Sequence, residues 1–158
     1  MTMSRTDPGA ANDPFDLNRF LKAQESDFGR ALAELKAGEK RSHWMWYIFP
    51  QIDGLAWSST SKKYSIKSLD EARAYLGHPV LGARLTECAS LILAVQGRTA
   101  AEIMGWPDDL KLRSSATLFA PVSPAGSVFH QLLDDYFQGK PDDKTMSLLG
   151  RSKPEESN

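Results

Sequence analysis

The stretch "RSHWMWYIFPQIDG", residues 41–54, places a histidine, two tryptophans, a tyrosine and a phenylalanine within one short run. Neighbouring residues of a helix lie about 100° apart, so these rings cannot all face the same core. Trp44 and Tyr47 can share one side of a helix, while Trp46 must point elsewhere. We therefore interpret the run as a short helix or turn, ending before Pro50, that joins a helical core to a second surface.

The segment that follows, "PQIDGLAWSSTSKKYSIK" (residues 50–67), has no clear hydrophobic period. An irregular connection of this length is uncommon inside a compact domain and is more often functional than incidental. Trp57, Tyr64 and Ile66 indicate that it is anchored, because such large side chains favour burial. The sequence thus predicts a long, ordered, irregular loop beside the aromatic stretch.

Helical patterns occur both before the aromatic stretch and after the irregular segment. Before the aromatic stretch, apolar residues recur at helical spacing from Leu17 to Leu35, with Asp13 predicted as the N-cap and Gly38 as the stop. After the irregular segment, "SLDE" and "TAAE" match the capping box, and no segment alternates with the period of a strand. The later helices are predicted at 68–77, 79–97, 99–104, 107–119, 127–137 and 142–149. The prediction is an all-α, single compact domain of about seven to nine mostly short helices with a long irregular loop.

Length and composition are those of one soluble domain. The chain has 158 residues, of which 41% are hydrophobic and 25% charged, and its formal net charge is −1. We expect a flexible N-terminal tail over 1–13, a helical domain over 14–150 and a frayed tail over 151–158.

The same composition bounds the partners. Basic residues are spread along the chain, so no nucleic-acid partner is expected. No apolar run reaches the roughly 20 residues that span a bilayer, and the N-terminus lacks a hydrophobic signal core. We expect no membrane partner and a cytoplasmic location, and the sequence leaves the oligomeric state open.

Motifs for metal, cofactor or nucleophilic chemistry are absent from the sequence. The single cysteine, Cys88, lies on the apolar face of a predicted helix, and we interpret it as a small buried hydrophobe. The histidines His43, His78 and His130 lack metal-ligand spacing, so no metal and no cofactor is predicted. There is no phosphate-loop, GxSxG or HExxH motif either. The sequence leaves open whether the chain is an enzyme.

Two polar residues interrupt predicted apolar faces. Gln24 lies four residues before Phe28, and a buried amide there needs a partner, either loop backbone or a ligand. Arg84 lies one residue before Leu85, where its guanidinium would order the loop, pair a carboxylate or grip a phosphate.

The remaining candidates gather around the aromatic stretch and one later helix. His43 either acts as an acid, base or hydrogen-bond donor near neutral pH or bridges a helix end. The tryptophans either fill the core or stack on a ligand. "LKLRSSATLF", residues 110–119, brings Lys111, Arg113, Ser114 and Ser115 together early in a helix whose start can receive an anion. The predicted ligand-binding residues are His43, Trp44, Trp46, Gln51, Tyr64, Lys111 and Ser114.

We predict a pocket between the aromatic stretch, the 50–66 loop and the helix near Lys111. Its ligand would be a small phosphate-bearing nucleotide or an ADP-ribose-like molecule, bound and, as a further option, hydrolysed. In this hypothesis Gln51 and Tyr64 orient polar groups, Lys111 offsets anionic charge and Trp46 stacks. The alternative is a non-catalytic protein-interaction module that uses an aromatic patch.

Five segments also carry a family resemblance: "FLKAQ", "ALAELKAGEKRSHWMWYIFPQIDGL", "SSTSKKYSI", "EARAYLGHPVLGARLTEC" and "DDLKLRSSATLF". Over residues 14 to 149 the chain resembles the bacterial and fungal DUF1810 family, a domain of unknown function. The resemblance implies a compact all-helical domain and brings no agreed activity. The calpastatin name that some members carry would imply inhibition through long disordered repeats, which this chain lacks. A fold-level likeness to the NADAR family, whose members act on ADP-ribose conjugates, shares no motif, so no residue role is carried over.

Overall fold

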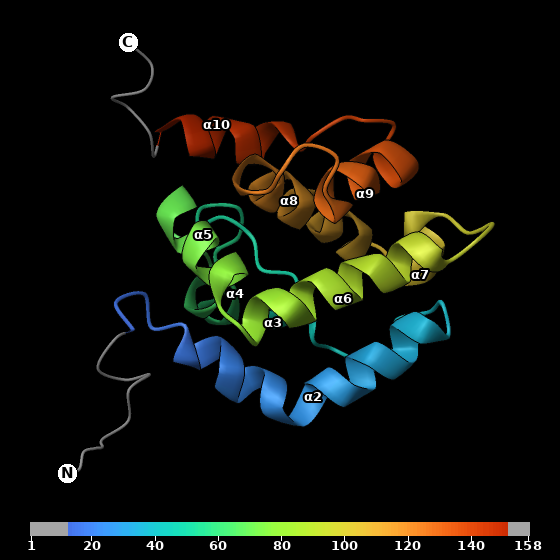
Figure 1. The fold of residues 1–158 in the computed structure, drawn as a ribbon, viewed down its shortest axis with the longest axis horizontal. Coiled ribbons are helices and arrows are strands. Elements are labelled where there is room, and N and C mark those ends of the chain that lie inside the picture. The colour runs from blue at the N-terminus through green and yellow to red at the C-terminus, as the bar shows by residue number, and fades with distance from the viewer. Residues whose placement is uncertain (1–12, 152–158) are drawn as a thin grey trace.

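The computed structural model describes residues 13–151 and shows an all-α chain in which α6 lies at the centre (Figure 1). Nine α-helices, most of them short, and no β-strand occur in this range, which confirms the predicted fold class. They are α2 (Asn18–Lys36), α3 (Met45–Ile48), α4 (Ser59–Lys63), α5 (Leu69–Gly77), α6 (Leu81–Ala94), α7 (Ala100–Met104), α8 (Asp108–Phe119), α9 (Val128–Phe137) and α10 (Asp143–Arg151), with the 3-10 helix η1 (Ala120–Val122). The two predicted tails lie outside the described residues, except that Asp13 is described and Arg151 ends α10.

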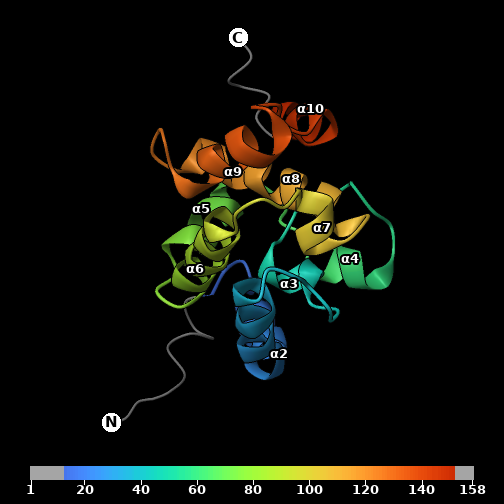
Figure 2. The ribbon, with the colours of Figure 1, turned by 90° about the vertical axis from the view of Figure 1, so that its right-hand side faces the viewer.

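The helices stack in layers. One side of α6 contacts α2 and the other contacts α9, which packs on α8, while α10 lies outermost on α8. Figures 1 and 2 show this order from two directions. A series of aromatic rings crosses the layers: the centroid of Phe20 lies 4.9 Å from that of Tyr75, and Phe119 lies 5.6 Å from both Tyr75 and Phe129. The rings tie α2, α5, α8 and α9 into one core.

Helix starts follow the predicted caps with two corrections. α2 begins at Asn18, although the Asp13 carboxylate still accepts the N–H groups of Leu17 at 2.7 Å and Asn18 at 2.9 Å. The box at Thr99 is complete, with both reciprocal bonds to Glu102. The capping box expected at residues 68–71 is only half formed. The Ser68 hydroxyl accepts the Glu71 N–H, but the Glu71 carboxylate accepts the N–H of Lys67 instead of that of Ser68.

The segment 50–67 is ordered and less irregular than predicted. It contains the single-turn helix α4, whose N-cap Ser58 accepts the N–H of Ser61 at 3.1 Å. Its ends pair in an isolated parallel bridge, in which the Ile66 N–H donates to the Gln51 carbonyl at 2.8 Å. One helical turn is too short to produce a recognisable period, which is why the sequence pattern missed it.

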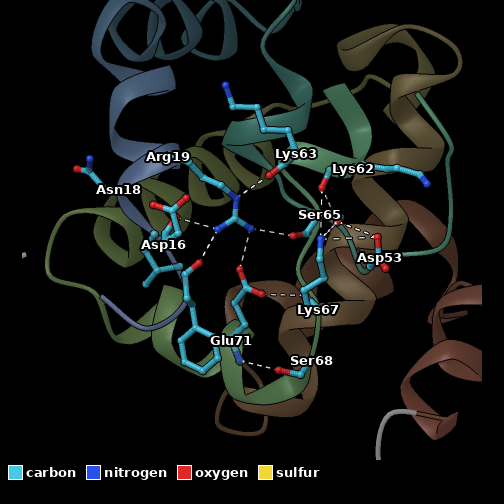
Figure 3. A network of polar contacts seen from close by, with 12 residues as sticks. Asp16, Asn18, Arg19, Asp53, Lys62, Lys63, Ser65, Lys67, Ser68 and Glu71 are labelled. Atoms are coloured by element: carbon cyan, nitrogen blue, oxygen red, sulfur yellow. Dashed lines mark hydrogen bonds and ion pairs between the residues drawn. The ribbon is translucent and has the colours of Figure 1, made fainter. Parts of the chain in front are cut away.

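Arg19 of α2 holds the end of this segment against the helical core (Figure 3). Its guanidinium donates to the carbonyls of Phe15, Lys63 and Ser65 and to the Glu71 carboxylate at 2.8 Å, with a further bond to the Asp16 carbonyl. All five N–H donors of the guanidinium are thereby used. We call this arrangement the Arg19 network, and it serves the fold, since no donor is left for a ligand.

Gln24 and Arg84 have structural partners. The Gln24 amide nitrogen donates to the Tyr47 carbonyl at 2.7 Å and contacts the Tyr75 hydroxyl at 3.0 Å. Its oxygen accepts from Arg84 at 3.2 Å, and that guanidinium lies 4.6 Å from the centroid of the Phe28 ring. Of the two partners proposed from sequence, backbone is therefore the observed one, but it belongs to α3 rather than to the loop.

Cys88 is buried in α6, as predicted. Burial raises the pKa of its thiol to about 12, so the reactive thiolate is scarce in the folded protein. We expect a thiol reagent at pH 8 to label Cys88 at least about 100-fold more slowly in the native protein than in denaturant. Equal labelling rates in the two conditions would contradict this burial.

Candidate functional site

A small pocket lies between α3 and the segment 50–66, which are two of the three parts of the predicted pocket, but no residue of α8 lines it. Its walls are Trp46, Gln51, Ile52, Gly54, Leu55, Ala56, Ser61, Tyr64 and Ser65, and we call it the Gln51 pocket. Its volume is about 10 Å³. This is close to the minimum that holds one water, so the pocket has room for a single oxygen-sized group and not for a ring.

Gln51 is the polar group that the pocket leaves unsatisfied. The residue is 7% exposed. Its backbone carbonyl is bonded to Ile66, but its side-chain nitrogen is buried and has no hydrogen-bond partner in residues 13–151. A buried donor without a partner costs about 1–3 kcal/mol, and such a group in a native fold calls for an explanation.

Tyr64 forms another part of the wall. It is the C-cap of α4, and its ring packs 5.2 Å from that of Tyr47 and 5.8 Å from that of Phe20. Its hydroxyl makes no hydrogen bond to any other described residue. The ring is therefore held in place by packing, while the phenolic hydroxyl is free to donate to a ligand or accept from one.

Three lysines lie over aromatic rings around this pocket. The ammonium of Lys111 is 4.6 Å from the centroid of Trp46, that of Lys62 is 5.3 Å from Trp57, and that of Lys63 is 5.4 Å from Tyr64. Lys62 and Lys63 pair with no carboxylate among residues 13–151. The rim therefore carries these three ammonium groups and also the carboxylate of Asp53, which accepts from the Ser65 hydroxyl at 2.9 Å and lies 3.8 Å from Lys67. This excess of positive charge favours an anion.

Asp108 connects Lys111 to a second, more buried lysine. Its carboxylate lies 2.8 Å from Lys40 and 3.0 Å from Lys111, and only 6% of the Lys40 side chain is exposed. Burial raises the pKa of Asp108, but the hydrogen bonds from Lys40 and Lys111 outweigh it and hold the pKa below its ordinary value. Two ammonium groups thus share one ionised carboxylate, which leaves a net positive charge beside Trp46.

Glu34 holds the segment that leads into α3, and sequence analysis did not single it out. Its carboxylate accepts the N–H groups of Arg41 at 2.8 Å and Ser42 at 3.0 Å, the Ser42 hydroxyl and the indole N–H of Trp44 at 2.9 Å. Burial raises the pKa of Glu34, but these bonds outweigh it and lower the pKa to about 2. The available signal was its position three residues after Ala31, on the apolar face of α2.

The structure brings together four of the seven predicted site residues. Trp46, Gln51 and Tyr64 line the Gln51 pocket, and Lys111 contacts the Trp46 ring. The other three lie outside this pocket: His43 is exposed, Trp44 is 1% exposed in the core, and the buried Ser114 hydroxyl donates to the Leu110 carbonyl at 3.2 Å. We therefore leave His43, Trp44 and Ser114 out of the proposed site.

Two further features are absent from residues 13–151. No group of three or more histidine, cysteine or carboxylate side chains is arranged to hold a metal ion. None of the helices in this range combines the length and hydropathy needed to cross a bilayer. The class defined by fold and site is an all-α domain with a small pocket of mixed polar and apolar lining beside a lysine-rich rim.

Comparisons with known proteins place this domain in a family. The chain belongs to the family described as "Protein of unknown function (DUF1810)", whose profile matches residues 14–149. The fold is similar to the crystal structure of the conserved hypothetical protein Rv1873 from Mycobacterium tuberculosis, with 51% sequence identity and a TM-score of 0.86. That similarity covers 87% of this chain and 99% of the other. A comparison with curated proteins found no match.

Proposed function

We propose that this domain binds a small phosphate-bearing ligand, such as a nucleotide or an ADP-ribose-like molecule, by one oxygen-bearing group at Gln51. The single observation that carries the proposal is the buried, unpartnered amide nitrogen of Gln51 in the pocket wall. A ligand oxygen would accept from this amide and remove the desolvation cost. The volume of about 10 Å³ requires the rest of the ligand to lie outside, over the rim.

The surrounding residues support an anionic ligand. Lys111 has two N–H donors beyond its bond to Asp108, and Lys62 and Lys63 lack carboxylate partners among the described residues. Phosphate oxygens would accept from such ammonium groups. The walls of the pocket contain no carboxylate, histidine or cysteine, so the geometry favours binding over hydrolysis.

The variant Gln51→Met tests this proposal through two opposite effects. We expect it to weaken ADP-ribose or ADP binding at least about tenfold, because the donor is lost. We also expect the unliganded protein to gain about 1–2 kcal/mol of stability, because an unsatisfied buried amide is removed. Calorimetric titration and chemical denaturation measure the two effects.

The matched control is Gln24→Met, in which a buried amide with three partners is lost. This variant should be less stable than the wild type. The proposal is wrong if ADP-ribose, ADP, ribose 5-phosphate and inorganic phosphate all fail to bind the wild-type protein at millimolar concentration. It is also wrong if Gln51→Met binds as tightly as the wild type.

A protein-interaction module is the second candidate function. The observation that favours it is the exposure of Trp57 and Trp106, which are 75% and 77% exposed. Such rings are frequent anchors of protein interfaces. Gln51→Met would leave a docking surface unchanged, since the residue is buried, and this separates the second candidate from the first.

A further inference from the structure

We propose that Trp57 and Lys62 form a second subsite, which takes the planar ring and a phosphate of the ligand held at Gln51. This inference rests on the proposed function and narrows the ligand to a phosphate that carries an aromatic ring. It assigns a role to the most exposed aromatic side chain near the pocket, which the Gln51 interaction alone leaves unexplained.

Both residues lie at the rim of the pocket by direct connectivity. Trp57 follows Ala56, and Lys62 follows Ser61, and both preceding residues line the pocket. Consecutive Cα atoms are about 3.8 Å apart, so each subsite residue begins one step from the wall. We therefore place the part of the ligand beyond the oxygen at Gln51 next to these two residues.

The single turn of α4 fixes the relative position of the two side chains. Ser58 accepts the Ser61 N–H through its side chain, and the Ser61 hydroxyl donates back to the Ser58 carbonyl at 2.8 Å. The ammonium of Lys62 then lies 5.3 Å from the centroid of the Trp57 ring. An aromatic surface and a cation held together in advance reduce the entropic cost of binding.

The chemistry of the pair selects the ligand class. Trp57 is 75% exposed, so most of its ring surface is available for stacking on a base. In Figure 3 the Lys62 side chain points away from the Arg19 network, and its ammonium has no carboxylate partner among residues 13–151. It is therefore available to a phosphate. A nucleoside phosphate uses both groups, whereas a sugar phosphate uses only the lysine.

The experiment compares ADP with ribose 5-phosphate on Trp57→Ala. We expect at least about tenfold weaker ADP binding and unchanged ribose 5-phosphate binding, because only ADP loses a stacking partner. Trp57→Phe should retain most of the ADP affinity. ADP should quench tryptophan fluorescence in the wild type, and this quenching should be largely lost in Trp57→Phe. Lys62→Met should weaken both ligands.

The matched control is Trp106→Ala, which removes a tryptophan of nearly equal exposure before α8 and should change neither affinity. Suppose that Trp57→Ala and Trp106→Ala bind ADP equally well, while Gln51→Met binds it weakly. The proposed subsite would then be wrong, and the proposed site at Gln51 would still stand. An equal loss of affinity for ADP and for ribose 5-phosphate in Trp57→Ala would also show that Trp57 does not stack on the base. Both proposals are wrong if ADP-ribose, ADP, ribose 5-phosphate and inorganic phosphate all fail to bind the wild-type protein.

Discussion

Gly82→Ala should lower the free energy of unfolding by about 3 kcal/mol or more. A Cβ atom at this position would lie 1.9 Å from the backbone carbonyl oxygen of Leu76, where the end of α5 meets the start of α6. A backbone atom cannot rotate away as a side chain does, so the two helices would have to separate. Chemical denaturation followed by circular dichroism measures the loss.

Gly29→Ala provides the matched control for this prediction. Gly29 lies inside α2, and nothing would come within 4 Å of an added Cβ. Because alanine favours a helix interior over glycine, this variant should be more stable by about 0.5–1 kcal/mol. A Gly82→Ala protein as stable as the wild type would show that α5 and α6 are not in backbone contact.

The second large effect is expected for Glu34→Gln, which should lower the free energy of unfolding by about 3 kcal/mol at neutral pH. The pKa of Glu34 falls from an ordinary value of 4.5 to about 2, and this difference corresponds to the stated free energy. The carboxylate has four donors around it, from Arg41, Ser42 and Trp44. An amide would present its own N–H groups to some of them, which leaves those donors unpaired.

The pH dependence of this effect has a definite sign. Because the folded pKa of Glu34 is lowered, its stabilisation is complete above pH 4.5 and is lost as the pH falls towards 2. The difference in stability between wild type and Glu34→Gln should therefore shrink between pH 5 and pH 2. Glu39→Gln is the control, because Glu39 is exposed and its ion pair with Arg41, at 3.4 Å, is long and solvated. This variant should have nearly the stability of the wild type. A stability difference that stays constant between pH 5 and pH 2 would show that the ionised Glu34 carboxylate does not stabilise the fold.

The sequence predicted only some of the residues that line the Gln51 pocket. Trp46, Gln51 and Tyr64 were predictable because a patternless segment with large aromatic residues beside an aromatic run indicates a built loop. Trp44 and Trp46 differ by two positions, and the sequence did not show which of them fills the core. The Glu34 carboxylate decides this by accepting the indole N–H of Trp44, a contact between residues ten positions apart.

Local chemistry explains what the sequence alone determined: the all-α class, most helix positions and the complete cap at Thr99. Periodicity and capping involve residues three or four positions apart, so they can be read without the fold. The tertiary structure alone decided that Arg19 would bind the end of segment 50–67, that the Gln51 amide would be buried without a partner, and that Gly82 would touch Leu76. The Arg19 and Gln51 features depend on segments far apart in the sequence, which only packing brings together. The Gly82 contact joins two consecutive helices, and it depends on the angle at which they meet.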